Sequence, residues 1–211
     1  MDWSPSFDRG QRWFDPLREA MAPFREHARW PTIDEWNAVF PPLSSRGGAP
    51  IRFVRQPPKR RGRPVDLDTI YDERIYVRGE VPSRPENWHD FFNMLVWCTF
   101  PKTKVAINAR QRAALRARVD PTMRRLPSAR SREQDLLAIL DEGGAIRRPD
   151  GTLLILGHAI YEHLACNPVP VHAYLYLSRA TALDEIDAEL AAFLDSGAPL
   201  DENGPSMTIT P

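Results

Sequence analysis

The sequence has few of the residues that build disulfide frameworks, zinc–thiolate sites or membrane spans. It contains 2 cysteines in 211 residues, Cys98 and Cys166, both in apolar contexts and without a CxxC or Cys/His cluster, so we expect two reduced core thiols. No stretch reaches about eighteen consecutive apolar residues, the length that a membrane helix needs. Met1 is followed by Asp2 rather than by a basic and apolar leader. We therefore expect a cytoplasmic protein with no membrane partner.

Motifs that mark well-known catalytic loops are also missing. The 11 glycines form no G-x-S-x-G, no G-x-x-x-x-G-K-[ST] and no G-x-G-x-x-G pattern, which excludes the nucleophile elbow, the P-loop and the dinucleotide-binding turn on local pattern. A ββα-metal nuclease fails as well, because that motif places its histidine at the end of a strand, whereas His89 falls inside a predicted helix. The function must be sought in less specific features.

Net charge is absent too, but the charges are separated along the chain. Residues 46–132 hold 20 Lys and Arg against 8 Asp and Glu, and residues 133–211 hold 3 against 13. A basic middle and an acidic end can attract each other within one molecule, or the basic part can face a polyanion. Overall neutrality gives no long-range attraction to nucleic acid, so we favour internal pairing.

What the sequence does have is one helix with two contrasting sides, over residues 84–100. Ser83 and Glu86 have the spacing of a capping box, which predicts the helix start. One side repeats large residues at helical spacing: Trp88, Phe91, Phe92, Leu95, Val96, Thr99 and Phe100. The other side carries three polar residues beside Met94 and Trp97: His89, Asp90 and Asn93. A helix that is apolar almost all round is buried, so these polar groups need partners inside the protein.

Apolar periodicity places further elements around this helix. Helices are predicted over residues 15–28 and 32–40 of a helical N-terminal part (1–45), and over 102–119, 158–166 and 183–195; strands are predicted over 51–55, 145–147, 152–156 and 169–177. Residues 198–211 are predicted to form a flexible tail.

Residues 134–140 are ambiguous. Ser131 and Gln134 could cap a helix there, but turn residues rich in Gly, Asp and Pro follow, and we take the segment as the first strand of a meander. The whole pattern predicts an α+β fold. We expect a single domain over residues 1–197, in which a small, mainly antiparallel sheet packs against helices around the central aromatic helix.

Two groups of polar residues could carry chemistry. The first is His89, Asp90 and Asn93 with Lys104 and Asn108 from the following helix, and the second is His158 and Glu162. His158 and Glu162 are four residues apart and share a helix face, and a helix N-terminus should keep His158 neutral. Four of these side chains are metal ligands by type: His89, Asp90, His158 and Glu162. If the two groups meet, these four could bind a divalent metal ion and, with Asn93, catalyse hydrolysis.

Each of these residues also has a structural interpretation. His89 could bond a backbone carbonyl, and Asp90 could stabilise the positive end of its own helix. Asn93 could cap a neighbouring loop, and His158 could form a local pair with Glu162. One distance separates the metal interpretation from the structural one. Two imidazoles more than about 10 Å apart could not share a metal ion, because ligand bonds are about 2 Å long.

Residues 57–64 form a basic, proline-rich segment without periodicity, which we expect to be an exposed loop. Its core, Arg61-Gly62-Arg63-Pro64, is similar to the AT-hook, whose arginines lie in the narrow minor groove of A·T-rich DNA. The candidates for nucleic-acid contact are Lys59, Arg60, Arg61 and Arg63. The alternative is a solvated, positively charged loop.

Three motifs together resemble one family. They are Asn87–Trp97 (NWHDFFNMLVW), Phe100–Lys104 (FPKTK) with Asn108, and Gly157–Glu162 (GHAIYE). Over residues 51–177 the chain resembles an uncharacterised bacterial family, domain of unknown function 3025, with residues 57–64 as an insertion. The resemblance implies a soluble bacterial protein, and it brings no established activity, cofactor or catalytic residue.

Three functions are compatible with these patterns. In the first, the polar cluster is structural or binds a small ligand or a partner. In the second, it is the centre of a metal-assisted hydrolase with a divalent metal as cofactor. In the third, the chain associates with nucleic acid through the basic loop and the helix over residues 102–119.

Overall fold

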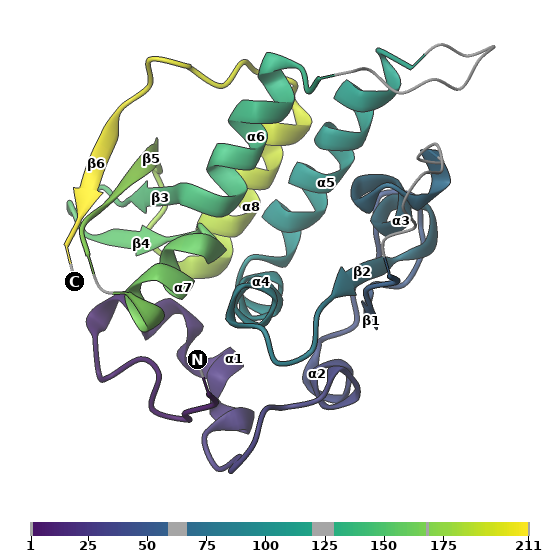
Figure 1. The fold of residues 1–211 in the computed structure, drawn as a ribbon. Coiled ribbons are helices and arrows are strands. Elements are labelled where there is room, and N and C mark those ends of the chain that lie inside the picture. Colours follow the sequence, from purple (N-terminus) through teal and green to yellow (C-terminus); the bar gives the residue numbers. More distant parts are fainter. Residues whose placement is uncertain (1, 59–66, 120–128, 168, 211) are drawn as a thin grey trace.

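The computed structural model describes residues 2–58, 67–119, 129–167 and 169–210. Helix α4 (Trp88–Thr99) lies at its centre (Figure 1), and nine of its 12 residues are buried. Its aromatic side packs against the N-terminal segment, where Trp3 stacks on Trp88 with ring centroids 5.3 Å apart and Phe24 meets Phe91 edge to face at 5.3 Å. Aromatic rings bury large apolar areas, so these contacts fix the N-terminal segment to the central helix.

Four further helices pack against α4 or against the helix that follows it. Helix α5 (Pro101–Arg116) follows it directly, and Pro101 suits the first helical position because its missing N–H has no partner to lose there. Helix α8 (Leu183–Asp195) lies along α5, and the Asp187 carboxylate accepts from the backbone N–H of Lys102 at 3.0 Å and of Thr103 at 2.8 Å. Helix α6 (Arg132–Gly143) packs on α5, and α7 (His158–Cys166) packs on α4.

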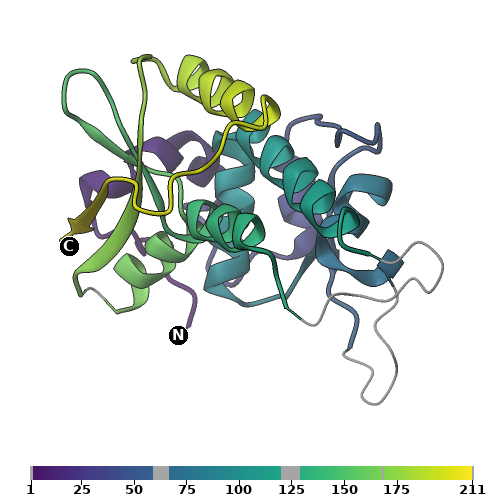
Figure 2. The ribbon, with the colours of Figure 1, turned by 90° about the horizontal axis from the view of Figure 1, so that it is seen from above.

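A four-stranded sheet lies on one side of these helices and a two-stranded sheet on the other (Figures 1 and 2). The larger sheet has the order β4–β3–β5–β6, with β3 at Gly144–Arg147, β4 at Leu153–Ile155, β5 at Val171–Leu177 and β6 at Ser206–Ile209. Strands β3 and β5 run parallel, and the other neighbours run antiparallel. In the smaller sheet β1 (Arg52–Arg55) pairs in parallel with β2 (Glu80–Ser83), and α3 (Tyr71–Arg78) lies in their connection.

The N-terminal part consists of short helical turns: η1 (Arg12–Leu17), α1 (Arg18–Met21), η2 (Ala22–Phe24) and α2 (Ile33–Val39), with η3 (Leu67–Thr69) later in the chain. Helix α2, predicted over residues 32–40, begins at a capping box in which Thr32 and Glu35 satisfy each other's backbone N–H groups. The single helix predicted from Asp15 is wrong. The helical turn already starts at Arg12, and Asp15 lies inside it and pairs with Arg18 at 2.5 Å.

The fold class is the predicted one, a single α+β domain with a small, mainly antiparallel sheet packed against helices around the central aromatic helix. Across the described ranges, no helix combines the length and apolarity needed to cross a membrane. The internal charge pairing that we favoured is confirmed, among the described residues, at four ion pairs between the basic middle and the acidic end: Lys104 with Asp141, Arg110 with Glu133, Arg46 with Asp195, and Arg132 with Glu202.

The strand predicted over residues 134–140 is wrong, because the segment belongs to α6. The capping box that we set aside is formed: the Ser131 hydroxyl accepts from the Gln134 N–H at 3.2 Å, and the Gln134 side chain accepts from the Ser131 N–H at 2.9 Å. Leu137 and Leu140 are both fully buried, three residues apart, as one helix face requires. The predicted meander therefore shrinks to the β3–β4 hairpin.

Helix α4 does not begin at its predicted capping box. Ser83 is the last residue of β2, and Glu86 has a φ of 54°, outside the helical region. The helix starts at Trp88, where the Asn87 side chain accepts from the Asp90 N–H at 3.1 Å. Because Ser83 pairs with Arg55 of β1, it is extended as part of β2 and does not cap the helix.

The flexible tail predicted for residues 198–211 is wrong for residues 206–209. These form β6, which pairs antiparallel with β5. Ile209 is 1% exposed and belongs to the core, and Trp13 Nε1 donates to the backbone oxygen of Thr210 at 3.0 Å. A strand of four residues is too short to show a period, so contacts that are distant in sequence decide its structure.

Candidate acid–base site

Helices α4 and α7 bring one histidine each to a common point. His89 lies in the first turn of α4, and His158 is the first residue of α7. Helix α7 begins directly against the end of α6, since a Cβ on Gly157 would lie 2.4 Å from the carbonyl oxygen of Glu142. A glycine permits this approach. It places His158 beside Asp141, whose backbone oxygen accepts from His158 Nδ1 at 2.8 Å.

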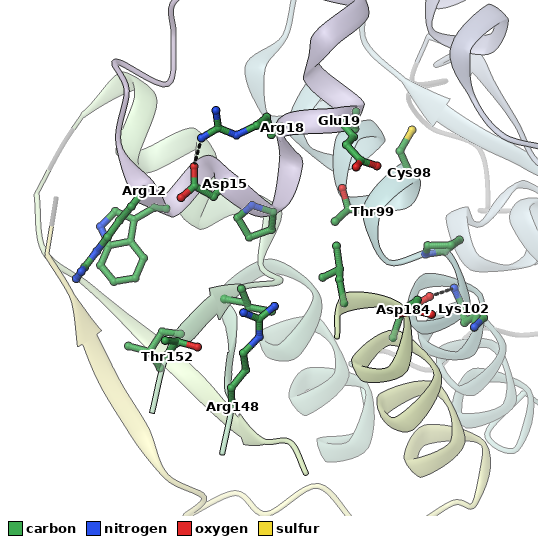
Figure 3. Close-up of a pocket in the computed structure, with 18 of the residues that line it drawn as sticks. Arg12, Asp15, Arg18, Glu19, Cys98, Thr99, Lys102, Arg148, Thr152 and Asp184 are labelled. Carbon is green, nitrogen blue, oxygen red and sulfur yellow. Dashed lines mark hydrogen bonds and ion pairs between the residues drawn. The ribbon is translucent and has the colours of Figure 1, made fainter. Parts of the chain in front are cut away.

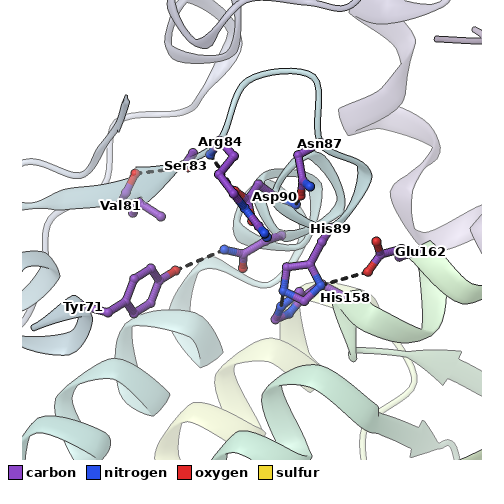
Figure 4. A network of polar contacts seen from close by, with 10 residues as sticks. Tyr71, Val81, Ser83, Arg84, Asn87, His89, Asp90, His158 and Glu162 are labelled. Atoms are coloured by element: carbon purple, nitrogen blue, oxygen red, sulfur yellow. Dashed lines mark hydrogen bonds and ion pairs between the residues drawn. The ribbon is translucent and has the colours of Figure 1, made fainter. Parts of the chain in front are cut away.

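The two imidazoles are in direct contact (Figure 4). Their Nε2 atoms are 3.1 Å apart and their ring centroids 4.5 Å apart, far inside the limit of about 10 Å set above. On its other side, His89 Nδ1 lies 3.0 Å from Glu162 Oε2. The three side chains become more buried in the order Glu162, His89 and His158, with exposed fractions of 37%, 28% and 5%.

The partners assign the protons on both rings. A carbonyl oxygen can only accept, so His158 carries a proton on Nδ1 and its Nε2 is an acceptor. His89 must then donate from Nε2, because two bare nitrogens 3.1 Å apart would repel each other. The Glu162 carboxylate accepts from His89 Nδ1. His89 therefore holds both protons and is an imidazolium between a carboxylate and a neutral imidazole.

The pKa values of the two histidines move in opposite directions. The hydrogen bond to Glu162 is the largest effect on His89 and, with the nearby charges of Glu162, Asp90 and Glu142, raises its pKa in spite of burial. Burial, followed by the charge of Lys104, lowers the pKa of His158 to about 3. The predicted neutral state of His158 agrees with this direction, but burial rather than the helix end is the main cause.

A buried ion pair lies next to His158. Lys104 is 3% exposed, pairs with the Asp141 carboxylate, and has its ammonium 5.4 Å from the ring centre of Trp97. Burial acts to raise the pKa of Asp141, but Lys104, His158 and His89 outweigh it, so the pKa lies below its usual value and the group is ionised. Asp141 thus has two tasks, because its backbone oxygen orients His158 and its carboxylate holds Lys104.

Asp90 and Asn93 share α4 with His89 but face other partners. The Asp90 carboxylate accepts from Arg84 three times, from the backbone N–H at 2.6 Å, from Nε at 2.9 Å and from Nη2 at 2.9 Å. Asn93 Nδ2 donates to the Tyr71 hydroxyl at 3.1 Å (Figure 4). Its Oδ1 is buried and has no hydrogen-bond partner among the described residues. Asp90 therefore holds the turn before α4, whereas Asn93 leaves an acceptor open one turn from His89.

Sequence reasoning missed two carboxylates of this region, Asp72 and Asp141. Asn108 donates to the backbone oxygen of Asp72 at 3.1 Å, and burial, followed by the charge of Asp141, raises the pKa of Asp72 to about 6. Asp141 was missed because its Asp-Glu-Gly-Gly context resembles a turn. The signal that could have found it was the cap at Ser131, since a helix starting there puts Asp141 on the buried face with Leu137.

The four predicted metal ligands do not converge on one point. Arg84 occupies both carboxylate oxygens of Asp90, and Glu162 lies at Nδ1 of His89, on the far side of the ring from the Nε2 contact. Within the described part of the chain, no group of three or more His, Cys, Asp or Glu side chains has an arrangement that could hold a metal ion. Metal binding stays a prediction without a converging ligand set.

The basic loop residues Lys59, Arg60, Arg61 and Arg63 lie outside the described residues, so their contact with nucleic acid stays a prediction. The cations of α5 are largely paired within the molecule: Lys104 with Asp141, Arg110 with Glu133, and both Arg112 and Arg116 with Glu73. Paired cations contribute less to phosphate binding than free ones.

A comparison with family models finds the resemblance that the motifs predicted. Residues 51–151 match the family described as Protein of unknown function (DUF3025). The match covers α4, α5 and α6, and therefore His89 and Asp141, whereas α7 with His158 and Glu162 lies beyond it. Comparisons with curated proteins and with solved structures found no match. The family description states no activity, so the function is argued from the geometry.

Proposed function

We propose that this chain is an enzyme in which His89 and Glu162 perform general acid–base catalysis on a small polar substrate. His158 positions His89, and we call these two histidines the imidazole pair. The supporting observation is the 3.1 Å contact of the two Nε2 atoms while an acceptor holds each Nδ1. This arrangement carries one proton more than two neutral histidines. It keeps that proton on the more exposed ring, within reach of a bound molecule.

His89 is the acid of the proposed site, and Glu162 is its exposed partner. With its pKa raised, His89 stays protonated into the neutral range, where an imidazolium is an effective proton donor. Glu162 uses Oε2 for His89, and its Oε1 has no hydrogen-bond partner in the described chain. Oε1 can receive a proton from a substrate hydroxyl or from water, and His89 can supply one to the group that leaves.

His158 is a positioning residue in this proposal. Its acceptor Nε2 holds the Nε2–H of His89, so the proton that His89 can transfer is the one on Nδ1, once a substrate group replaces Glu162 Oε2 as its acceptor. Burial keeps His158 neutral, since its pKa is lowered to about 3. Asp141 and Lys104 hold His158 in place from behind through the backbone oxygen and the ion pair.

A purely structural network would satisfy its own polar groups, because an unpaired buried acceptor is costly. Asn93 Oδ1 is such an acceptor among the described residues, one turn from His89. Both His89 and Glu162 also reach the surface. The unpartnered Asn93 acceptor, one helical turn away, and the exposure of His89 and Glu162 support a ligand that exchanges a proton at His89.

Hydrolysis of a panel of aryl esters, amides, phosphomonoesters, phosphodiesters and glycosides tests the proposal. We expect the wild-type chain to turn over at least one class, with kcat/KM reduced by about 10²- to 10⁴-fold in His89→Gln, the usual contribution of a positioned acid or base. Glu162→Gln should produce a similar loss. His163→Gln is the matched control, because His163 lies on the same helix, α7, and outside the imidazole pair.

Two outcomes would contradict the proposal: no turnover of any class by the wild-type chain, or an equal loss in His163→Gln. The alternative of a metal-assisted hydrolase lacks a converging ligand set in the described chain. The predicted bacterial origin and cytoplasmic location stay predictions.

A further inference from the structure

A hollow of about 1300 Å³ lies at the end of α4 that is remote from His89 (Figure 3). Five segments form its walls: residues 12–23, the end of α2 at residues 39–41, the α4–α5 corner at residues 98–102, the β3–β4 turn with the start of β4 at residues 148–154, and the first turn of α8. Much of the lining is apolar, including Trp13, Pro16, Ala20, Leu153, Leu154 and Leu183. Concave sites with apolar walls and a few polar groups are the usual sites for small molecules.

Arg148 extends from the β3–β4 turn into this hollow (Figure 3). Its Nε is buried and has no hydrogen-bond partner, and no carboxylate in the described part of the chain forms an ion pair with its guanidinium. A buried donor without an acceptor is unfavourable, and buried cations are normally paired. An acceptor from outside the chain would satisfy this group.

The carboxylates nearest in the lining are already engaged. Asp150 Oδ1 accepts from the backbone N–H and the hydroxyl of Thr152 at 2.8 and 2.7 Å. Asp187 caps α5 with both oxygens, and Asp15 pairs with Arg18. None of these three side chains forms an ion pair with Arg148, and the charge of Arg148 is a minor contribution to the lowered pKa of Asp150, behind its hydrogen bonds to Thr152.

Two further cations and two further carboxylates complete the charged lining. The Arg12 guanidinium lies 4.8 Å from the ring centre of Trp13, and the side chain of Lys102 has no ion-pair partner among the described residues. Glu19 and Asp184 are exposed carboxylates. Arg148 is the least exposed of the lining cations, so it is the cation that an anion meets deepest in the hollow.

We propose that this hollow binds a small organic anion, with a carboxylate or phosphate group on Arg148 and an apolar body against Trp13 and Leu183. A guanidinium offers parallel N–H donors that match two oxygens of such a group, including the Nε–H that lacks an acceptor. The site is separate from the imidazole pair. Anion binding in this hollow therefore does not depend on the catalysis proposed for His89.

Ligand-observed NMR titration with benzoate and with phenyl phosphate tests the proposal, with benzamide as the neutral analogue. We expect saturable binding of at least one anion, with an affinity about tenfold or more higher than that of benzamide. A charge-assisted hydrogen bond contributes at least about tenfold to affinity. Binding of benzoate alone would assign a carboxylate, and binding of phenyl phosphate alone would assign a phosphate.

The decisive comparison is between two adjacent arginines. Arg148→Gln should weaken anion binding about tenfold or more. Arg148→Lys should weaken it by less, because the positive charge stays while the two parallel N–H donors of the guanidinium are lost. Arg147→Gln is the matched control, since Arg147 is the exposed last residue of β3 and does not line the hollow. Three results would overturn the proposal: neither anion binds, benzamide binds as tightly, or both glutamine variants behave alike. The Lys variant keeps the test valid if Arg148→Gln fails to fold.

Discussion

Two buried ionic clusters of this protein differ in what neutralises them. Glu73, 2% exposed, accepts from Nε of Arg112 at 3.1 Å and of Arg116 at 2.9 Å, and each arginine also reaches its second oxygen. Permanent cations thus neutralise Glu73. In the imidazole pair, the charge of Glu162 is neutralised by a proton on His89, which can dissociate. A carboxylate neutralised by arginines stabilises the fold at any ordinary pH, whereas neutralisation by a proton depends on pH.

The largest effect is expected where the imidazole pair meets its buried support. Lys104→Met leaves the Asp141 carboxylate buried without its cation, which should lower the free energy of unfolding by about 3–5 kcal/mol. The change should also raise the pKa of His158, because the charge of Lys104 helps to lower it. Urea denaturation and the ¹⁵N shifts of the His158 ring measure the two effects.

Lys102→Met is the control for this change, because Lys102 is exposed on the same helix and its side chain has no ion-pair partner among the described residues. We expect a change within about 0.5 kcal/mol there. An equal loss in the two variants would show that the Lys104 pair does not support the site.

A smaller effect is expected in the Glu73 cluster. Glu73→Gln keeps the shape but leaves Arg112 and Arg116 without their anion, and both can turn toward water because their side chains are 26% and 39% exposed. The free energy of unfolding should fall by about 2 kcal/mol, less than for a fully buried pair. The ring shifts of His158 should not change. A change there would mean that the two clusters are coupled and the contrast between them is false.

The smallest effect, counted for each pH unit, is expected in the pH dependence of the free energy of unfolding. The pKa of His89 is raised above its ordinary value of 6.5, so its stabilising effect is complete below 6.5 and is lost as pH rises through the raised pKa. The pKa of His158 is lowered from 6.5 to about 3, so stability is lost as pH falls from 6.5 toward 3. Stability should therefore peak near pH 6.5, with limbs of at most about 1.4 kcal/mol per pH unit from each histidine.

Urea denaturation between about pH 4 and 9 measures these limbs, and single variants assign them. His158→Asn should flatten the acid limb, and His89→Gln should flatten the alkaline limb. Glu73→Gln should keep both. Carboxylates with lowered pKa values, such as Asp141 and Glu73, leave a residual acid limb in every variant. If the acid limb is as steep in His158→Asn as in the wild type, His158 does not contribute to it and the proton assignment of the imidazole pair is wrong.

The aromatic side of α4 could be predicted from the sequence, because one helix repeats its pattern every turn. Trp88, Phe91 and Phe92 follow that pattern and are buried. His89 and His158 could be nominated from their own helices, but their contact could not. They are 69 residues apart, and only the packing of α7 against α4 sets their distance.

Other errors arose where a distant contact overrules a local signal. Ser83 has the spacing of a cap and becomes the end of a strand, because β1 pairs with it. The segment at Asp141 resembles a turn and is the end of a helix, because Leu137 and Leu140 belong in the core. Asp90 resembles a metal ligand, yet Arg84, six residues earlier, occupies it. Contacts with distant parts of the chain decided the first two cases, whereas the partner of Asp90 is close in the sequence.

Gly157 has a consequence for the chemistry of the imidazole pair. The position has an ordinary helix-entry backbone, with φ −66° and ψ 112°, so it needs glycine for space rather than for conformation. A methyl group there would meet the Glu142 carbonyl and push α7 away from α6. His158 would move with its helix. The proton affinity of His89 is thus controlled from a residue that has no side chain and touches neither ring.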